Sequence, residues 1–174
     1  GGCRSGRVMT IGVQVATSLF TVFFSAAVLF VIVRIQFRQR EHADRQRATI
    51  DFVERCLWNS EYIKSRQEFI QLRDDPDRPI DVWARADMSN RAELSVIRAS
   101  LNEYELVAVG IINGLYDEAI YREYWRGTLL ADWQCCRLFV LKVRDVVGPG
   151  VYSNFENLAE AWRSGRAFKP HNGM

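Results

Sequence analysis

The sequence predicts an all-α protein in which one N-terminal transmembrane helix continues into a stalk and is followed by a small helical bundle. Two observations predict this fold class. Residues 8–33 contain no charged side chain, and the rest of the chain repeats apolar residues three and four positions apart, as helices do. The expected parts are an N-terminal tail (1–7), the transmembrane helix (8–33), a basic helical stalk (34–47), a cytoplasmic helical bundle (48–165) and a flexible tail (166–174).

The apolar segment 8–33 is long enough to cross a bilayer. At about 1.5 Å of rise per residue, a helix of this length spans a hydrocarbon core roughly 30 Å thick. A cleaved secretory signal is the alternative, with Arg4 and Arg7 as its basic start and Ser25–Ala27 as its cleavage site. The apolar run continues past that site to Val33, which favours an uncleaved anchor.

Basic residues flank the apolar segment unevenly. Two arginines precede it and five follow it closely: Arg4 and Arg7 before it, and Arg34, Arg38, Arg40, Arg45 and Arg47 after it. Because cytoplasmic flanks are enriched in Lys and Arg, we expect a single-pass protein of the inner (plasma) membrane with its C-terminal domain in the cytoplasm. Residues 34–47 contain neither Pro nor Gly, so the membrane helix is expected to run on into the stalk.

Charge and cysteine content narrow the function classes. The net charge is +2, from 23 basic and 21 acidic residues, and this balance gives no case for a nucleic-acid partner. The four cysteines, Cys3, Cys56, Cys135 and Cys136, show no disulfide framework, and neighbouring Cys135 and Cys136 disfavour a bridge between them. Free thiols in a reducing compartment are expected.

The first part of the expected bundle contains two breaks. Apolar residues of 48–73 have helical spacing that is interrupted at Asn59 and Ser60, which fits either one kinked helix or two. Two prolines within 74–79 end the helix there. Ile80 and Trp83 are then expected to return to the core in a short helical turn.

The strongest helix is predicted to begin at a capping box formed by Asn90 and Glu93 and to end at Gly114. Within it, residues 106–112 are apolar nearly all round, which predicts a central helix buried on most sides. Gly110 suggests that another helix crosses closely there. The apolar positions are Leu94, Ile97, Leu101, Tyr104, Ala108, Ile111 and Leu115.

Two further helices complete the expected bundle. Asp117 and Glu118 suit the positive end of a helix dipole and predict the start of the next helix. Ser153 and Glu156 form a capping box for a short last helix that Gly165 closes. The apolar face of the longer helix comprises Tyr121, Trp125, Leu129, Trp133, Cys136, Val140, Val143 and Val147.

Residues Leu101–Ile111, followed by Gly114–Glu118, Tyr121, Tyr124–Trp125 and Asp132–Trp133, make a distinctive pattern. With Ser60–Ile63, Arg66, Tyr152, Phe155 and Trp162, it resembles the bacterial membrane-anchored helical family catalogued as domain of unknown function 4760. The likeness covers residues 48–165. It implies an N-terminal span and a helical domain, and it carries over no activity.

Motifs of catalysis are missing from the sequence. The two histidines, His42 and His171, both lie outside the expected bundle, which disfavours a His-dependent triad, a zincin helix or a di-iron bundle. We predict no catalytic, cofactor-binding or metal-binding residues, and a binding protein more than an enzyme. One polar cluster, more typical of an ion-pair network than of acid–base chemistry, is expected near residues 103–126: Glu103, Glu105, Asp117, Glu118, Arg122 and Arg126.

Two hypotheses for function follow. The first is a membrane-anchored helical interaction or scaffold protein whose partners are the lipid bilayer and either a second copy or another protein. Gly12 and Ala16, four residues apart, could bring two spans together in a homodimer. The alternative is a membrane-tethered small-ligand sensor or enzyme whose site of Glu, Arg and aromatic residues shows no motif.

Overall fold

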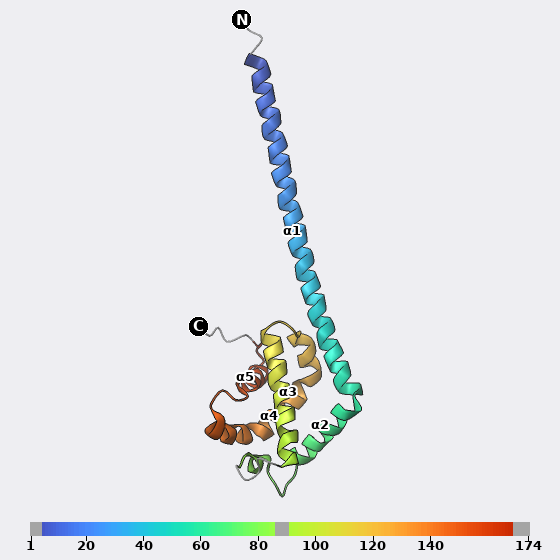
Figure 1. Cartoon of the computed structure of the whole chain (residues 1–174), viewed down its shortest axis with the longest axis vertical. Helices are drawn as coiled ribbons and strands as arrows, with labels where there is room; N and C mark the ends of the chain where they lie inside the picture. Colours follow the sequence, from blue (N-terminus) through green and yellow to red (C-terminus); the bar gives the residue numbers. More distant parts are fainter. Residues whose placement is uncertain (1–4, 86–90, 169–174) are drawn as a thin grey trace. The chain divides into compact units, whose positions relative to one another are not determined.

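The computed structural model describes the backbone of residues 5–85 and 91–168, and the side chains of these ranges from Phe23 onward. Every regular element in these ranges is helical, which confirms the all-α prediction for them (Figure 1). The elements are α1 (Ser5–Trp58), α2 (Ser60–Arg73), the short 3-10 helix η1 (Ile80–Ala84), α3 (Ala92–Ile112), α4 (Glu118–Val147) and α5 (Ser153–Arg163).

The chain divides into two compact units, Gly1–Ala43 and Asp44–Met174. The boundary falls within α1, inside the segment expected to be the stalk. Over the described part of the chain, no helix has an apolar stretch long enough to cross a membrane. Residues 8–22 of the expected span, with Gly12 and Ala16, lie outside the part whose side chains are described.

In the first unit, α1 exposes large apolar side chains on every side. Six consecutive residues, 28–33, are each at least 42% exposed. Because a helix has 3.6 residues per turn, six consecutive side chains point all round it. The exposed apolar residues at 23–33 are Phe23, Phe24, Val28, Leu29, Phe30, Val31, Ile32 and Val33.

The second unit begins with a helix break that the sequence left open. The chain forms two helices, α1 and α2, and Asn59 between them is the N-cap of α2. Its side-chain oxygen accepts a hydrogen bond from the Tyr62 backbone N–H at 2.9 Å, which satisfies a donor that the new helix would leave unpaired. The predicted return of Ile80 and Trp83 to the core is confirmed, since each is 4% exposed in η1.

Helix α3 buries most of its predicted apolar face, with Leu94, Ile97, Leu101, Tyr104 and Ala108 all inside. One expectation was wrong, since Leu115 is 63% exposed because the helix ends at Ile112. Within the segment 106–112, Leu106 is 61% exposed and the other positions are buried or half-buried, so this segment is buried on most sides as predicted. The expected capping box involves Asn90, which lies outside the described residues.

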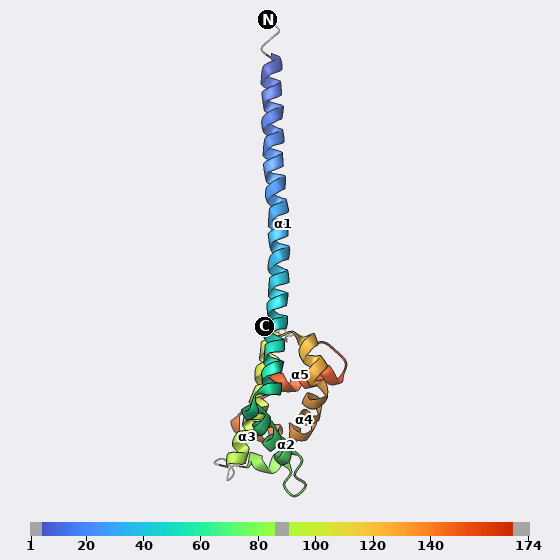
Figure 2. The same ribbon diagram turned by 90° about the vertical axis from the view of Figure 1, so that its right-hand side faces the viewer.

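The helices of the second unit pack around one apolar core. Helix α3 contacts α2, α5 and η1, while α4 contacts η1, α5 and α2. Helices α3 and α4 run in opposite directions and are joined by a short connection (Figures 1 and 2). The largest fully buried side chains are Trp162, Tyr121, Phe69, Phe139 and Phe155.

Helix α4 starts as predicted, with Asp117 as its N-cap, because the Asp117 carboxylate accepts from the backbone N–H groups of Ala119 and Ile120. Most of its predicted apolar face is buried, but Val147 at its last position is 65% exposed.

The C-terminal segment differs from the flexible tail that was expected for 166–174. Phe168 is 8% exposed and belongs to the core, while residues 169–174 lie outside the described part.

Gly110 marks a close approach, although not the predicted crossing of another helix. A Cβ atom at this position would lie 2.4 Å from Cδ2 and 2.6 Å from Cε2 of the Tyr116 ring. Tyr116 belongs to the connection between α3 and α4, and its ring also packs on Phe52 at 5.4 Å between centroids. The glycine therefore leaves room for an aromatic ring from the connection.

We expect Gly110→Ala to lower the free energy of unfolding by about 1–3 kcal/mol, because the Tyr116 ring must move. The matched control is Gly127→Ala in α4, where an added Cβ meets nothing within 4 Å. That change should raise stability by up to about 1 kcal/mol through helix propensity. Denaturant unfolding of the full chain in detergent would measure both changes, and stabilisation by both would contradict the steric account.

Candidate functional site

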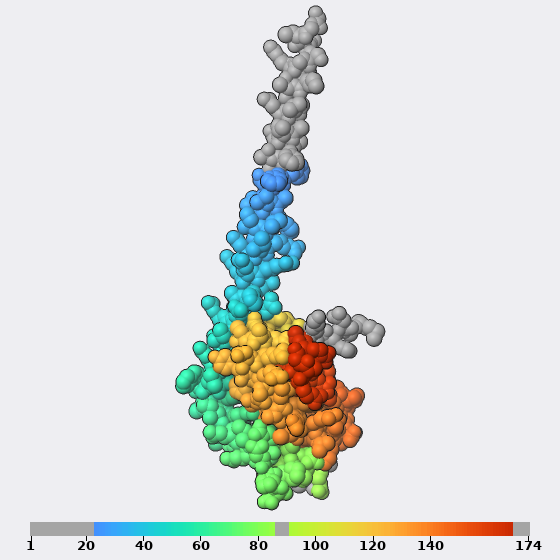
Figure 3. Space-filling view, turned by 180° about the vertical axis from the view of Figure 1, so that it is seen from behind, coloured from blue at the N-terminus to red at the C-terminus, as the bar shows by residue number. Residues whose placement is uncertain are grey.

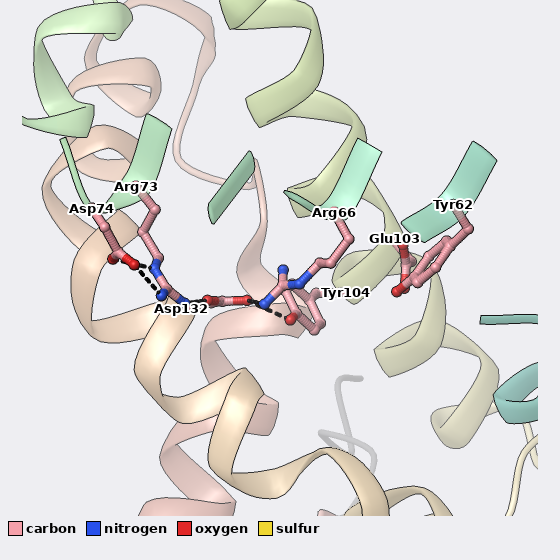
Figure 4. A network of polar contacts seen from close by, with 7 residues as sticks. All are labelled: Tyr62, Arg66, Arg73, Asp74, Glu103, Tyr104 and Asp132. Carbon is pink, nitrogen blue, oxygen red and sulfur yellow. Dashed lines mark hydrogen bonds and ion pairs between the residues drawn. The ribbon is translucent and has the colours of Figure 1, made fainter. Parts of the chain in front are cut away.

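The most buried charge in the described residues is the carboxylate of Asp132, which is 0% exposed. Figure 4 shows it between the guanidinium groups of Arg73 and Arg66. Its Oδ1 accepts from Arg73 Nη1 at 2.5 Å, and its Oδ2 accepts from Arg66 Nη2 and from the Tyr104 hydroxyl, each at 2.5 Å. Two cations and a phenol therefore surround one buried anion.

Three helices supply these groups. Arg66 and Arg73 are seven residues apart on α2, which places them on one face about two turns apart. Tyr104 comes from the buried face of α3, and Asp132 from the buried face of α4. The network thus connects α2, α3 and α4 through one carboxylate.

Each arginine has a second partner. The Arg66 guanidinium carbon lies 5.0 Å from the centre of the Phe69 ring, a cation–π contact. Arg73 also binds the Asp74 carboxylate, with Nε and Nη2 each 2.7 Å from an oxygen. Burial, followed by the charge of Asp132, holds the pKa of Tyr104 well above its usual value, so this phenol keeps its proton and donates it. The arrangement suits holding helices together.

A second polar group lies beside this network, at the corner between α1 and α2. The Tyr62 hydroxyl donates to Glu103 Oε1 at 2.7 Å (Figure 4). Burial raises the pKa of Glu103, and the hydrogen bond from Tyr62 partly opposes this rise. Burial also raises the pKa of the Cys56 thiol to about 11, so Cys56 is protonated and unsuited to act as a nucleophile at neutral pH.

These groups line a pocket of about 310 Å³, which we call the corner pocket. It is formed by Phe52, Arg55, Cys56, Asn59, Glu61, Tyr62 and Glu103.

Glu105 lies two residues after Glu103 on α3, but it binds the start of α5. Its Oε1 accepts from the Asn154 side chain at 2.8 Å and backbone at 3.3 Å, and its Oε2 accepts from the Phe155 backbone at 2.8 Å. The carboxylate thus satisfies free N–H groups at the start of α5, where a negative charge also suits the helix dipole. The predicted capping box was wrong, since the N-cap is Tyr152 with no side-chain cap bond, and Glu156 binds Arg144 at 2.6 Å.

Asp117 joins α4 to α1 in addition to capping α4. Its backbone N–H donates to the Thr49 hydroxyl at 2.7 Å, and that hydroxyl donates to the Arg45 carbonyl at 2.8 Å. Thr49 is fully buried. One hydroxyl thereby fixes the start of α4 against the last turns of α1 within the second unit.

Glu118, Arg122 and Arg126 hold the C-terminal segment on α4. Glu118 Oε1 accepts from the Trp162 indole at 2.9 Å and from the Phe168 backbone at 2.7 Å. Arg122 and Arg126 donate to the carbonyls of Arg166 and Trp162 at 3.2 and 3.1 Å. Figure 3 shows the red C-terminal segment against the yellow-orange surface of α4. An open groove of about 590 Å³ remains, lined by Glu118, Ala119, Arg122, Glu123, Arg126 and Ala167.

The structure therefore brings together three of the six residues in the predicted cluster, namely Glu118, Arg122 and Arg126. Glu103, Glu105 and Asp117 have separate partners. The prediction did not include the network around Asp132, although the sequence contained its signal. Asp132 follows Leu129 by three positions and precedes Cys136 by four, so it lies on the apolar face of α4, where a carboxylate needs a cationic partner.

No group of three or more His, Cys, Asp or Glu side chains that could hold a metal ion occurs in the described part of the chain. No curated protein and no solved structure matches the sequence. A family model does match, over residues 11–162, which covers both the segment with the exposed apolar residues and most of the helical bundle. The chain belongs to the family described as domain of unknown function (DUF4760).

Proposed function

We propose that this chain is a single-pass, membrane-anchored helical module that acts by binding a protein partner or a second copy of itself. The observation that carries the proposal is the exposure of apolar side chains all round α1 at residues 28–33. A helix that is apolar on every side is stable when an apolar medium or a protein core surrounds it. A bilayer is the medium that the sequence favours.

The sequence supports both the insertion of this helix into a bilayer and the cytoplasmic orientation of the bundle. The uncharged run begins at Val8 and ends at Val33, which is the length of a membrane-spanning helix. The arginine-rich segment 34–47 follows it directly, and such segments remain on the cytoplasmic side. The proposed location is therefore the inner (plasma) membrane, with the bundle in the cytoplasm.

A matched pair of substitutions tests the anchor. Phe20→Arg places a charge near the middle of the apolar run, at a cost of about 3 kcal/mol for insertion. Phe37→Arg makes the same change in the stalk. We expect the wild type and Phe37→Arg to stay in membranes washed with alkaline carbonate, and Phe20→Arg to be released to a larger extent.

Reporters fused after Met174 test the orientation. A reporter that works only in the cytoplasm should be active, and one that needs the periplasm should be silent. Release of the wild type by carbonate would overturn the anchor, and activity of the periplasmic reporter would overturn the orientation.

The bundle offers one apolar face for association. On α4, Cys135, Leu138 and Leu141 follow at three-residue intervals and point outward on neighbouring turns. Leu138 is 60% and Leu141 40% exposed, and the Cys135 thiol is exposed. Confinement to a membrane raises the effective concentration of such faces, so weak apolar contacts become sufficient.

Cysteine crosslinking in native membranes tests the association. In a Cys3→Ser background, Cys135 is the exposed thiol because Cys56 and Cys136 are buried. We expect a bismaleimide to yield a crosslinked dimer or a defined adduct with another protein, and Leu138→Glu to reduce that product with little effect on stability.

Two controls complete the crosslinking test. Cys135→Ser should abolish the product, while Gly12→Leu and Ala16→Leu show whether the spans take part. Monomer alone at every crosslinker length would overturn the association.

A further inference from the structure

The corner pocket is separate from the faces that the proposed function uses. It lies within the second unit, at the junction of α1, α2 and α3, and measures about 310 Å³. This volume suits a small molecule. We propose that the corner pocket binds a small organic cation, an ammonium group with or without methyl substituents, against the Glu103 carboxylate.

The first observation concerns the carboxylate of Glu103. Its Oε1 accepts a hydrogen bond from the Tyr62 hydroxyl. Among the described residues, no donor occupies Oε2. Tyr62 thereby fixes the orientation of the carboxylate and leaves one oxygen for a ligand in the pocket.

The second observation concerns the aromatic rings of the pocket. Phe52 and Tyr62 line the pocket. The rings of Tyr116 and Tyr121 do not line the pocket but pack on Phe52, with centroids 5.4 and 6.1 Å from that of Phe52. Aromatic faces attract cations, methylated ammonium ions in particular, and the two lining rings lie beside the Glu103 carboxylate.

The third observation concerns the charged groups around Glu103. Its positive neighbour Arg66 is already paired with Asp132, so that arginine does not fully neutralise Glu103. Glu61 adds a second negative charge to the lining and Arg55 one positive charge. The titratable and charged groups that face Glu103 are Arg55 and Cys56 from α1, Glu61, Tyr62 and Arg66 from α2, and Tyr121 and Asp132 from α4.

Protonation links binding to pH. Burial raises the pKa of Glu103, so the free pocket holds a proton on this carboxyl to a higher pH than an exposed glutamate would. A bound cation favours the ionised carboxylate. Binding should therefore release a proton and weaken as the pH falls through the raised pKa of Glu103.

The test uses choline and its uncharged isostere 3,3-dimethylbutan-1-ol as probes, with the full chain in detergent micelles and calorimetric titration. We expect saturable binding of choline and no binding of the alcohol at the same concentration. Glu103→Gln keeps an acceptor for Tyr62 and should weaken choline binding by about tenfold or more. The control Glu54→Gln alters an exposed carboxylate of α1 that is not part of the pocket lining, and it should change the affinity by less than about threefold.

The pH profile gives a second readout. Choline affinity of the wild type should fall at acidic pH, and that of Glu103→Gln should not. Equal binding of choline and the alcohol, binding of neither at millimolar concentration, or an unchanged affinity in Glu103→Gln would each overturn the proposal. These outcomes are independent of the membrane and crosslinking tests, because the pocket lies entirely in the second unit.

Discussion

Replacement of Asp132 by alanine is expected to lower the free energy of unfolding by about 3–5 kcal/mol. The loss exceeds that of the ion pairs themselves, because the partners of Asp132 would stay buried. Arg66 and Arg73 are only 14% and 16% exposed, so both guanidinium groups would remain largely buried without their anion. Tyr104 would also have a buried hydroxyl with no acceptor. Denaturant unfolding of the full chain in detergent micelles measures this loss.

The control for this prediction is Asp74→Asn. Asp74 accepts two hydrogen bonds from Arg73, one of the partners of Asp132, but its side chain is 55% exposed. Solvent screens such a pair, and its removal should cost no more than about 1 kcal/mol. Similar losses for the two variants would show that burial of the Asp132 network does not decide its contribution.

Ala108→Asp should have a comparable effect, with a loss of about 3–5 kcal/mol or complete unfolding of the second unit. Ala108 is 0% exposed in α3, one turn before the end of the helix, and its neighbour Val107 is also fully buried. A carboxylate here would have to lose its hydration without a partner, or remain protonated at neutral pH. The cooperative unfolding transition of the full chain would be followed by circular dichroism.

Leu106→Asp is the matched control for this change. It introduces the same side chain two positions away on the same helix, where Leu106 is 61% exposed. This variant should unfold within about 0.5 kcal/mol of the wild type. A normal melt for Ala108→Asp, or equal losses for both variants, would show that the buried face of α3 is placed incorrectly.

The helical periodicity of the sequence predicted the elements of the bundle well, because burial repeats with the turn of the helix. It overestimated their extent at the ends. Leu115 and Val147 continue the apolar spacing, yet Leu115 follows the end of α3 and Val147 is the last residue of α4. Apolar spacing says nothing about where the chain leaves the helix, since glycine and local capping contacts decide that.

The candidate cluster was harder to predict, for a geometric reason. Glu103 and Glu105 are two positions apart on one helix, so their side chains point to nearly opposite sides and cannot share a site. One faces Tyr62 and the other the start of α5. Asp132 gives the opposite case, because its partners Arg66 and Arg73 are distant in sequence. Only the packing of α2 on α3 and α4 brings them together.

The cap that α3 provides for α5 has a consequence for how the protein matures. Helix α5 has 11 residues, which is too short to be stable in isolation. Its first turn depends on a carboxylate that was synthesised about 50 residues earlier, as the separation of Glu105 and Phe155 shows. Helix α5 also carries Trp162 and Phe155, which complete the core. We therefore expect the nascent bundle to remain open until α5 has been synthesised, and to close only when α5 docks.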